Sequence, residues 1–223
     1  MTPLLIAISG KKNSGKDTLC DYCIQQLQVQ DWSCEKLGFA TELKRQVHVL
    51  FGVPYNILYG DNETKGQLCR VKWEDLPFKP TQAWIEKNGW HNEIPRGYMT
   101  VRSLLQIWGT EIVRSIYNNA WVDALIVNAQ SSFSEIIFVN DCRFPNELEG
   151  IQANGGVVLR LTRAIYEEDQ HESETALDQD VFDWARFDRV IPNHGMNLED
   201  TRHVVWEYVK YCAKGYEERR WEM

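Results

Sequence analysis

The sequence predicts an α/β fold, a three-layer sandwich in which helices cover both faces of a mostly parallel five-stranded sheet. Three observations support this class. Short apolar runs of strand length recur along the chain, segments with apolar residues at helical spacing separate them, and the first run ends in a glycine-rich loop. With 223 residues, 43% of them apolar, the chain is long enough for one substantial core, so we predict a single domain over residues 1–223.

The first half of the chain predicts two strand–helix units. Leu4–Ser9 is a nearly continuous apolar run typical of a strand buried on both faces, and the helix after the glycine loop carries apolar residues as far as Leu27. Cys34–Phe39 is the second predicted strand, and the helix behind it ends near Phe51. Residues 52–99 are rich in Pro, Gly, Trp and charge without clear periodicity, so we interpret them as an insertion.

The second half continues the alternation. Thr100 can cap a helix whose apolar positions are Leu104, Leu105, Trp108, Ile112 and Ile116. The later predicted elements are a helix at 120–130, a strand at 135–141, a short helix at 146–156, a strand at Val157–Leu161, a last strand at Arg189–Ile191 and a helix from Asn197, where "NLED" resembles a capping box. Ligands of such a sheet are expected at the carboxyl ends of its strands.

The loop "GKKNSGKDT" nearly matches G-x-x-x-x-G-K-[ST], a phosphate-binding loop, except that Asp17 stands where a hydroxyl is expected. Its glycines let backbone N–H groups converge on phosphate oxygens at a helix N-terminus. Lys11, Lys12 and Lys16 crowd this loop, which is unfavourable unless an anion binds there. We therefore predict a nucleotide phosphate site formed by Lys12, Asn13, Ser14, Gly15, Lys16, Asp17 and Thr18.

Acidic and basic residues near this loop predict the remaining chemistry. A carboxylate beside phosphates is repelled unless a cation or the helix terminus compensates it, so Asp17 either holds Mg²⁺ with Thr18 or caps the helix. Asp141, at the end of the strand 135–141, is either a further magnesium ligand or a turn aspartate. Arg143 is expected to face the loop and, with Lys16 and Asp141, to act on a transferring phosphoryl group.

Other functional classes find little support. The formal charge of −8 argues against broad binding of nucleic acid, "HESET" is not a zinc-binding H-E-x-x-H, and G-x-S-x-G is absent from the sequence. Cys20 and Cys23 form a C-x-x-C inside a predicted helix, where packing is a better explanation than redox chemistry. Because we find neither a signal-peptide pattern nor a membrane-length apolar run, we expect a cytoplasmic protein that does not bind membranes.

Five strings, in order, carry a family resemblance: "SGKKNSGKDT", "TVRSLLQIWGTEIVRSIYNNAWVD", "NDCRFPNELEGIQANGGVVLRLTR", "HESE" and "DRVIPNHGMNLED". They resemble the bacteriophage-type deoxynucleoside monophosphate kinases, relatives of phosphomevalonate and dephospho-coenzyme A kinases. The resemblance implies a P-loop kinase fold with a helical acceptor-binding insertion at about 52–99 and a lid at about 163–180. It also implies transfer of the ATP γ-phosphoryl group to a deoxynucleoside 5′-monophosphate with Mg²⁺, in host cytoplasm if a phage encodes the chain.

The resemblance also implies roles for individual residues. Asp141, Arg143 and Glu147 would meet the acceptor nucleotide and the moving group, and Arg163 and Asn193 would lie near the ATP base. The other acceptor-binding candidates are Lys44, Arg102, Trp121 and Glu174. A homodimer is a family-level expectation. Two alternatives stay open: a kinase for another phosphorylated acceptor, such as dephospho-coenzyme A or phosphomevalonate, and a non-catalytic nucleotide-binding switch.

Overall fold

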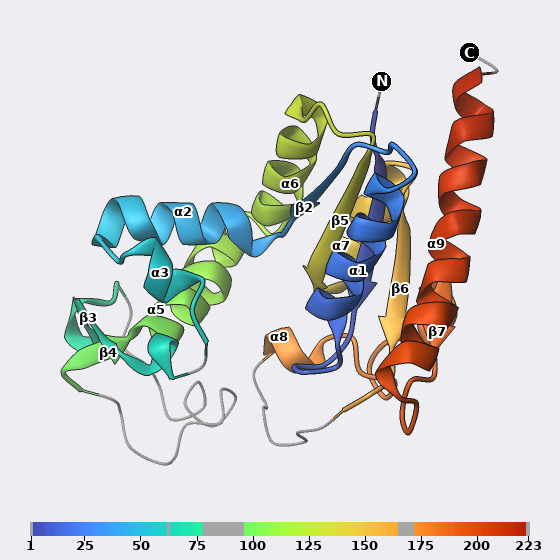
Figure 1. The fold of residues 1–223 in the computed structure, drawn as a ribbon. Coiled ribbons are helices and arrows are strands. Elements are labelled where there is room, and N and C mark those ends of the chain that lie inside the picture. Colours follow the sequence, from blue (N-terminus) through green and yellow to red (C-terminus); the bar gives the residue numbers. More distant parts are fainter. Residues whose placement is uncertain (1, 62, 78–95, 165–171, 222–223) are drawn as a thin grey trace. The chain divides into compact units, whose positions relative to one another are not determined.

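The computed structural model describes residues 2–61, 63–77, 96–164 and 172–221 (Figure 1). The chain divides into two compact units. The sheet unit comprises Met1–Phe39, Val122–Asp169 and Ser173–Met223, and the helical unit comprises Ala40–Trp121 with Gln170–Glu172. The helical unit spans more of the chain than the predicted insertion, because it includes the helices on either side of residues 52–99.

A five-stranded parallel sheet forms the centre of the sheet unit within the described residues. Its order is β2-β5-β1-β6-β7, with β1 at Leu4–Ser9, β2 at Cys34–Leu37, β5 at Ile136–Cys142, β6 at Val157–Leu161 and β7 at Arg189–Ile191. All four neighbouring pairs are parallel, so the carboxyl ends of the strands share one edge, toward which the arrows of β5 and β6 point in Figure 1. The predicted fold class is confirmed.

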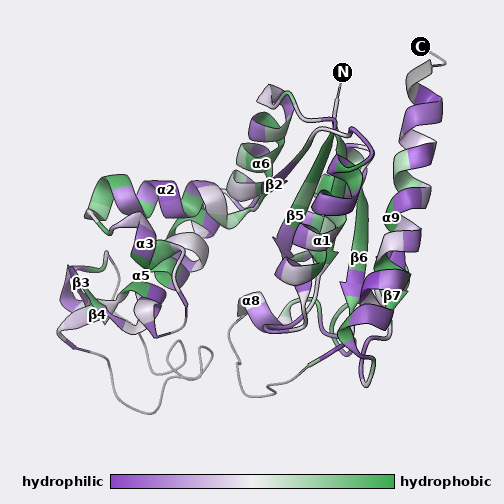
Figure 2. Ribbon diagram, in the orientation of Figure 1, coloured by the Kyte–Doolittle hydropathy of each residue, from purple (hydrophilic) through white to green (hydrophobic). Residues whose placement is uncertain are grey.

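Helices cover both faces of this sheet. Leu4, Ile6 and Ile8 alternate along β1 and pack into a core with apolar residues of α1 (Lys16–Gln28) and α9 (Leu198–Trp221). The other face is covered by α7 (Pro145–Ala153), which contacts β1 and β6 and packs against the start of α6 (Ala120–Ser131). β1 and most of β5 are therefore buried between the two layers of helices. The hydropathy colouring in Figure 2 shows most of β5 as hydrophobic.

Two predicted helix caps are confirmed. The Asn197 side-chain oxygen accepts from the backbone N–H of Asp200 at 2.8 Å, and the Asn197 amide donates to the Asp200 carboxylate at 2.7 Å. Thr100 Oγ1 accepts from the backbone N–H of Ser103 at 3.0 Å, which caps α5 (Val101–Gln106). The bonds from the backbone N–H groups of Asp200 and Ser103 each satisfy a donor that the first helical turn leaves without a partner in the helix.

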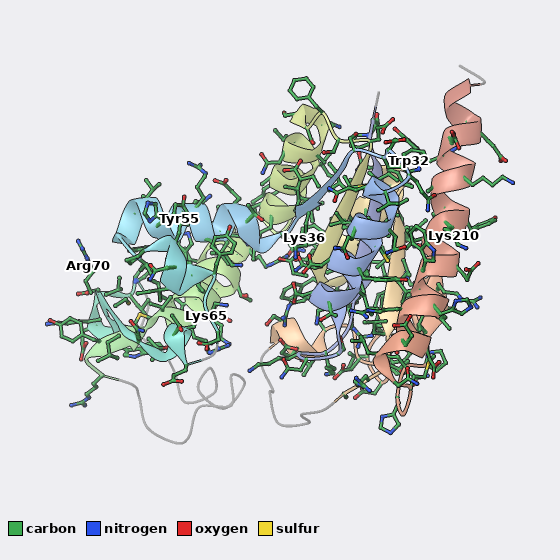
Figure 3. All side chains as sticks on the ribbon, viewed as in Figure 1. Trp32, Lys36, Tyr55, Lys65, Arg70 and Lys210 are labelled. Atoms are coloured by element: carbon green, nitrogen blue, oxygen red, sulfur yellow. The ribbon has the colours of Figure 1, made fainter. Side chains whose placement is uncertain are left out.

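The edge strand β2 is held by contacts to the first helix. Lys36 extends from β2 and pairs with Asp21 of α1 at 2.5 Å (Figure 3). In the turn that precedes β2, the Trp32 ring lies 6.3 Å from that of Tyr216 on α9. A charged side chain on an edge strand also discourages pairing with other chains.

The helical unit has its own core, formed by Val47, Val53, Leu58, Val101 and Leu104. Its helices are α2 (Ala40–Phe51), α3 (Tyr55–Leu58) and α5, with a π-helical segment at Ile107–Arg114 and short 3₁₀ turns at Thr64–Gly66 and Trp73–Asp75. An antiparallel pair is formed by β3 (Leu68–Lys72) and β4 (Tyr98–Thr100). The predicted insertion therefore contains regular structure, which its irregular composition conceals.

The π-helical segment changes which residues are buried after α5. An expected regular helix would place Ile116 on the same face as Leu105, eleven residues earlier, but Ile116 is 82% exposed whereas Ile107 and Gly109 are buried. A π-turn is wider than an α-turn and rotates the following residues away from the α-helical face. The predicted apolar face is therefore wrong at Ile116.

Close packing of α6 on α7 gives a stability prediction at Gly150. A Cβ added there would overlap with Cγ1 of Val122. Alanine in place of this helical glycine favours the helix by about 1 kcal/mol, but overpacking costs about 1–3 kcal/mol. We expect Gly150→Ala to lower the free energy of unfolding by about 1 kcal/mol, measured by urea denaturation.

The Val122→Ala background supplies the test of this cause. There the added methyl group has room, so Gly150→Ala should raise rather than lower the free energy of unfolding. Gly215→Ala in α9 is the matched control, because a Cβ at Gly215 meets nothing within 4 Å and should stabilise the helix. Equal losses in both Val122 backgrounds would contradict the packing explanation.

Candidate active site

The loop between β1 and α1 has the tight conformation that a phosphate-binding loop requires. Asn13 and Gly15 have φ values of 60° and 101°, and the Ser14 N–H bonds the Lys11 carbonyl at 3.1 Å. A Cβ on Gly10 would lie 2.6 Å from Ser14 Oγ, so a side chain at Gly10 would disrupt this turn. The loop leads directly into the N-terminus of α1, where backbone N–H groups favour an anion.

Lys16 folds back over this loop. Its Nζ donates to the carbonyl oxygens of Gly10 at 2.8 Å and Lys11 at 2.7 Å, and the residue is 6% exposed. Burial lowers the pKa of Lys16 to about 7, and the positive charge of Arg143 adds to this effect. Asp17 and Asp141 act in the opposite direction, so both carboxylates lie within electrostatic reach of the ammonium group.

Asp17 and Thr18 are exposed in the first turn of α1, beside the loop. The side-chain amide of Asn140, near the end of β5, donates to the Asp17 carboxylate. This contact orients Asp17 across the end of the sheet. Asn140 was not among the predicted site residues, although its position directly before Asp141 is the signal that could have indicated it.

Asp141 joins the ends of two neighbouring strands. Its Oδ1 accepts from the backbone N–H of Phe39 at 2.8 Å, and a Cβ at Gly38 would lie 2.8 Å from its Oδ2. Residues 38 and 39 follow β2, so the close approach needs a glycine there. The contact holds Asp141 at the carboxyl edge of the sheet, where the sequence predicted it.

The donors at this edge suit Mg²⁺. Two carboxylates, Asp17 and Asp141, and the Thr18 hydroxyl supply the oxygen ligands that this ion prefers. Among the described residues no group of three or more His, Cys, Asp or Glu side chains is arranged to hold a metal ion. In nucleotide sites Mg²⁺ commonly binds through one or two carboxylates together with phosphates of the substrate.

Arg143 is fixed by the helix that follows it. The Glu147 carboxylate is buried and accepts from the backbone N–H groups of Arg143 at 2.7 Å and Phe144 at 3.1 Å, which caps α7. The Arg143 guanidinium pairs with the Glu174 carboxylate and donates to the Ser173 carbonyl at 3.3 Å. In this structure Glu147 positions the backbone of Arg143. A contact between Glu147 and the acceptor stays a prediction.

A short helix from the predicted lid, α8 (Glu172–Thr175), lies against the loop; Figure 1 shows it beside the start of α1. Lys11 Nζ donates to the Glu174 carbonyl at 2.6 Å and pairs with the Asp178 carboxylate at 2.5 Å. The backbone N–H of Lys12 donates to Glu174 Oε2 at 3.3 Å. Residues 165–171 of the predicted lid lie outside the described residues.

Arg160 is a buried cation at this edge that the sequence analysis did not select. It is 5% exposed, donates to Ser9 Oγ at 3.0 Å and lies 3.7 Å from the Asp178 carboxylate, with its guanidinium 5.1 Å from the Trp184 ring. Its charge contributes to the low pKa of Lys16. The signal was an arginine within the otherwise apolar strand "VVLRL".

Asn193 connects the loop to the end of β6. Its side-chain amide donates to the Ser14 carbonyl at 3.1 Å, and its side-chain oxygen accepts from the backbone N–H of Arg163 at 2.8 Å. The Arg163 guanidinium donates to the Met196 carbonyl at 2.9 Å. Asn193 is 1% exposed, so it supports the loop as a buried side chain. Contacts of Arg163 and Asn193 with the ATP base stay a prediction.

Three of the remaining acceptor-binding candidates, Lys44, Arg102 and Trp121, belong to the helical unit. Lys44 Nζ lies 4.1 Å from the centre of the Tyr59 ring, and Arg102 is partly buried on α5. Trp121 is 3% exposed, and its indole N–H donates to the Gly109 carbonyl at 2.9 Å. Trp121 is thus a core residue that supports the π-helical segment, and the binding of the acceptor by these three residues stays a prediction.

A phosphate-binding loop before the first helix of a parallel α/β sheet, with lysine, arginine and carboxylate side chains around it, defines a protein of the P-loop class. A sequence model of the deoxynucleotide monophosphate kinases matches residues 73–203, more than half of the chain. The chain belongs to the deoxynucleotide monophosphate kinase family. Membership of this family implies ATP and a deoxynucleoside monophosphate as substrates.

Two individual proteins illustrate how far the similarity extends. A protein of Acanthamoeba polyphaga mimivirus, provisionally described as a deoxynucleotide monophosphate kinase, is 26% identical over 191 residues, which cover 78% of this chain and 82% of that protein. A Mycobacterium tuberculosis APS kinase structure matches 94% of this chain and 98% of its own, at 8% identity and a TM-score of 0.41. Among the described residues, no helix is long and apolar enough to cross a membrane.

Proposed function

We propose that the protein transfers the γ-phosphoryl group of ATP to the 5′-phosphate of a deoxynucleoside monophosphate, giving the diphosphate. The observation that carries this proposal is the gathering of Lys16, Arg143 and Asp141 at the carboxyl edge of the sheet, beside the phosphate loop. Phosphoryl transfer needs positioning and neutralisation of charge rather than a covalent nucleophile, and this edge supplies both.

Each part of the loop has a separate task in this proposal. The backbone N–H groups of residues 12–16 hold the phosphates of ATP at the N-terminus of α1. Lys16 exchanges its contacts with the Gly10 and Lys11 carbonyls for the terminal phosphates, where its charge compensates the negative charge of the transition state. Arg143 contacts the moving phosphoryl group from the opposite side, through the fork of donors on its guanidinium group.

Asp17, Thr18 and Asp141 are the residues that would hold Mg²⁺, and the ion would neutralise charge on the phosphate oxygens of ATP. Asn140 keeps Asp17 in place for this task through its side-chain amide. Asp141 is kept in place by the backbone N–H of Phe39. Both carboxylates are therefore oriented before any ligand binds, which lowers the cost of ordering them.

The helical unit would bind the acceptor nucleotide, with Lys44, Arg102 and Trp121 as its candidate residues. Residues 52–99, which lie within this unit, would select the base. A homodimer remains a proposal from the family resemblance. Closure of the region after Arg163 would keep water away from the γ-phosphate and so limit wasteful hydrolysis of ATP.

The experiment that tests the function measures ADP formation with a panel of acceptors. Deoxynucleoside 5′-monophosphates should raise the rate well above the basal hydrolysis of ATP, because their phosphate accepts the transferred group. Free deoxynucleosides and deoxynucleoside diphosphates serve as matched controls and should give no stimulation. Product identity is checked by chromatography of the diphosphate.

Two outcomes would contradict the proposal. Equal stimulation by a deoxynucleoside without its 5′-phosphate would exclude a monophosphate acceptor. Stimulation by dephospho-coenzyme A or phosphomevalonate, with none by any deoxynucleoside monophosphate, would assign the same site to a different acceptor.

A further inference from the structure

The Glu174 carboxylate lies against the phosphate loop although it comes from a distant part of the chain. Its side chain is 10% exposed, a low value for a carboxylate. Glu174 Oε2 accepts from the backbone N–H of Lys12 at 3.3 Å, and Oε1 pairs with the Arg143 guanidinium. A loop amide and an arginine therefore bind this carboxylate from two directions.

These two donors are of the kind that binds a phosphate group. Backbone N–H groups of a glycine-rich loop and a guanidinium fork each bind phosphate oxygens, and each also binds a carboxylate. The lysines of the loop are engaged as well, since Lys11 bonds the Glu174 carbonyl and the Asp178 carboxylate, and Lys16 bonds carbonyls of the loop itself. The Glu174 carboxylate thus stands in the place of an anionic ligand.

We infer that Glu174 occupies the position of a nucleotide phosphate when the site is empty, and that binding of a polyphosphate displaces it. This inference rests on the proposed function, because it takes Arg143 and the loop as the phosphate-binding site. Glu174 then lowers the affinity for the ligand, because only protein molecules in which the carboxylate has left the phosphate position can bind. The apparent dissociation constant rises as the fraction of such molecules falls.

A competing carboxylate differs in its consequences from a residue that merely orients Arg143. If Glu174 competes with phosphate ligands, removing its charge frees the phosphate-binding site and strengthens the binding of these ligands. If Glu174 orients Arg143, the same change loosens the arginine and weakens binding. The two roles therefore predict opposite signs for one measurement.

The measurement is calorimetric binding of inorganic pyrophosphate and of ATP to the full chain. Glu174→Gln keeps the size of the side chain but removes its charge, so its dissociation constant for both ligands should fall about three- to tenfold. Glu149→Gln is the matched control, because Glu149 carries the same charge on α7 but pairs at the surface with Arg186 at 2.7 Å. It should change the dissociation constants by less than about twofold, the effect of one distant screened charge.

The outcomes separate this inference from the proposed function. Unchanged or weaker binding of pyrophosphate and ATP by Glu174→Gln, relative to Glu149→Gln, would overturn the competing role and leave the kinase assignment intact. A failure of both ligands to bind any of the three proteins would contradict the phosphate site, and with it both proposals. Tighter binding by Glu174→Gln alone supports displacement of the carboxylate.

Discussion

Arg143→Lys is expected to retain nucleotide binding and to lose most of its turnover, with kcat and kcat/KM falling together by about ten- to a hundredfold. The arginine lies at the carboxyl edge of the sheet, where its charge reaches Lys16 and its backbone is fixed by Glu147. A guanidinium can bridge two phosphate oxygens through its planar fork, whereas an ammonium group supplies one point charge. The loss should therefore fall on the transition state, in which charge spreads over the moving group.

Steady-state kinetics with varied acceptor at saturating ATP check this expectation. Arg186→Lys is the control, because Arg186 makes a surface ion pair with Glu149. If KM alone rises for Arg143→Lys and saturating acceptor restores kcat, then Arg143 only anchors the acceptor. The main stabilisation of charge would then belong to another arginine, with Arg163 the next candidate.

The strands could be predicted because burial on both faces leaves a plain signal. The ranges of β1, β6 and β7 coincide with their predictions, and β5 is displaced from its prediction by one residue at each end. β2 ends at Leu37, two residues before its prediction, because Gly38 and Phe39 turn toward the carboxylate of Asp141. That turn depends on a contact with residue 141, which no local pattern reveals.

The phosphate-binding loop could also be predicted from the sequence, whereas several residues that contact it could not. Glycine spacing located Gly10 to Lys16, since backbone geometry at a helix N-terminus restricts the residues that fit. Asn140, Arg160 and Asp178 were missed because their importance comes from contacts between distant segments. Arg160 and Asp178 are the clearest case, since together they link Ser9 of β1 to Lys11 of the loop.

In the helical unit, composition gave the location of an unusual region but not its structure. Gly109 in the π-helical segment packs closely on Leu43, since an added Cβ would lie 2.8 Å from the Leu43 side chain, and the Trp121 indole N–H donates to the Gly109 carbonyl. Both contacts are tertiary. A 3.6-residue period fitted to "VRSLLQIWGTEIVRSI" therefore describes α5 but not the wider turn after it.

Lys16→Met is expected to lower turnover by about a hundredfold, which corresponds to roughly 3 kcal/mol of transition-state stabilisation. Methionine keeps much of the length and volume of the side chain but can neither bond the carbonyls of Gly10 and Lys11 nor compensate the charge of a phosphate. A rate loss below about threefold in single-turnover measurements would remove Lys16 from the mechanism.

The low pKa of Lys16 makes a second, independent readout of the same residue. With a pKa of about 7 in the nucleotide-free protein, Lys16 is mostly neutral at pH 8, and burial is the main cause. Bound phosphates favour the charged form and raise this pKa, so binding of ATP above pH 7 takes up a proton, while below pH 7 the proton is already present. The affinity for ATP should therefore fall with rising pH above 7, by up to about tenfold per unit.

Lys16→Arg is the matched variant for this test, because a guanidinium stays charged throughout the range. Calorimetric titration with ATP at pH 8, in two buffers with different ionisation enthalpies, counts the protons taken up. Wild type should take up close to one proton more than Lys16→Arg, and the difference should disappear at pH 6, where Lys16 is already protonated before ATP binds. Equal proton uptake by the two proteins at pH 8 would show that the ammonium group is charged before the nucleotide arrives, and that burial in the loop does not govern its protonation.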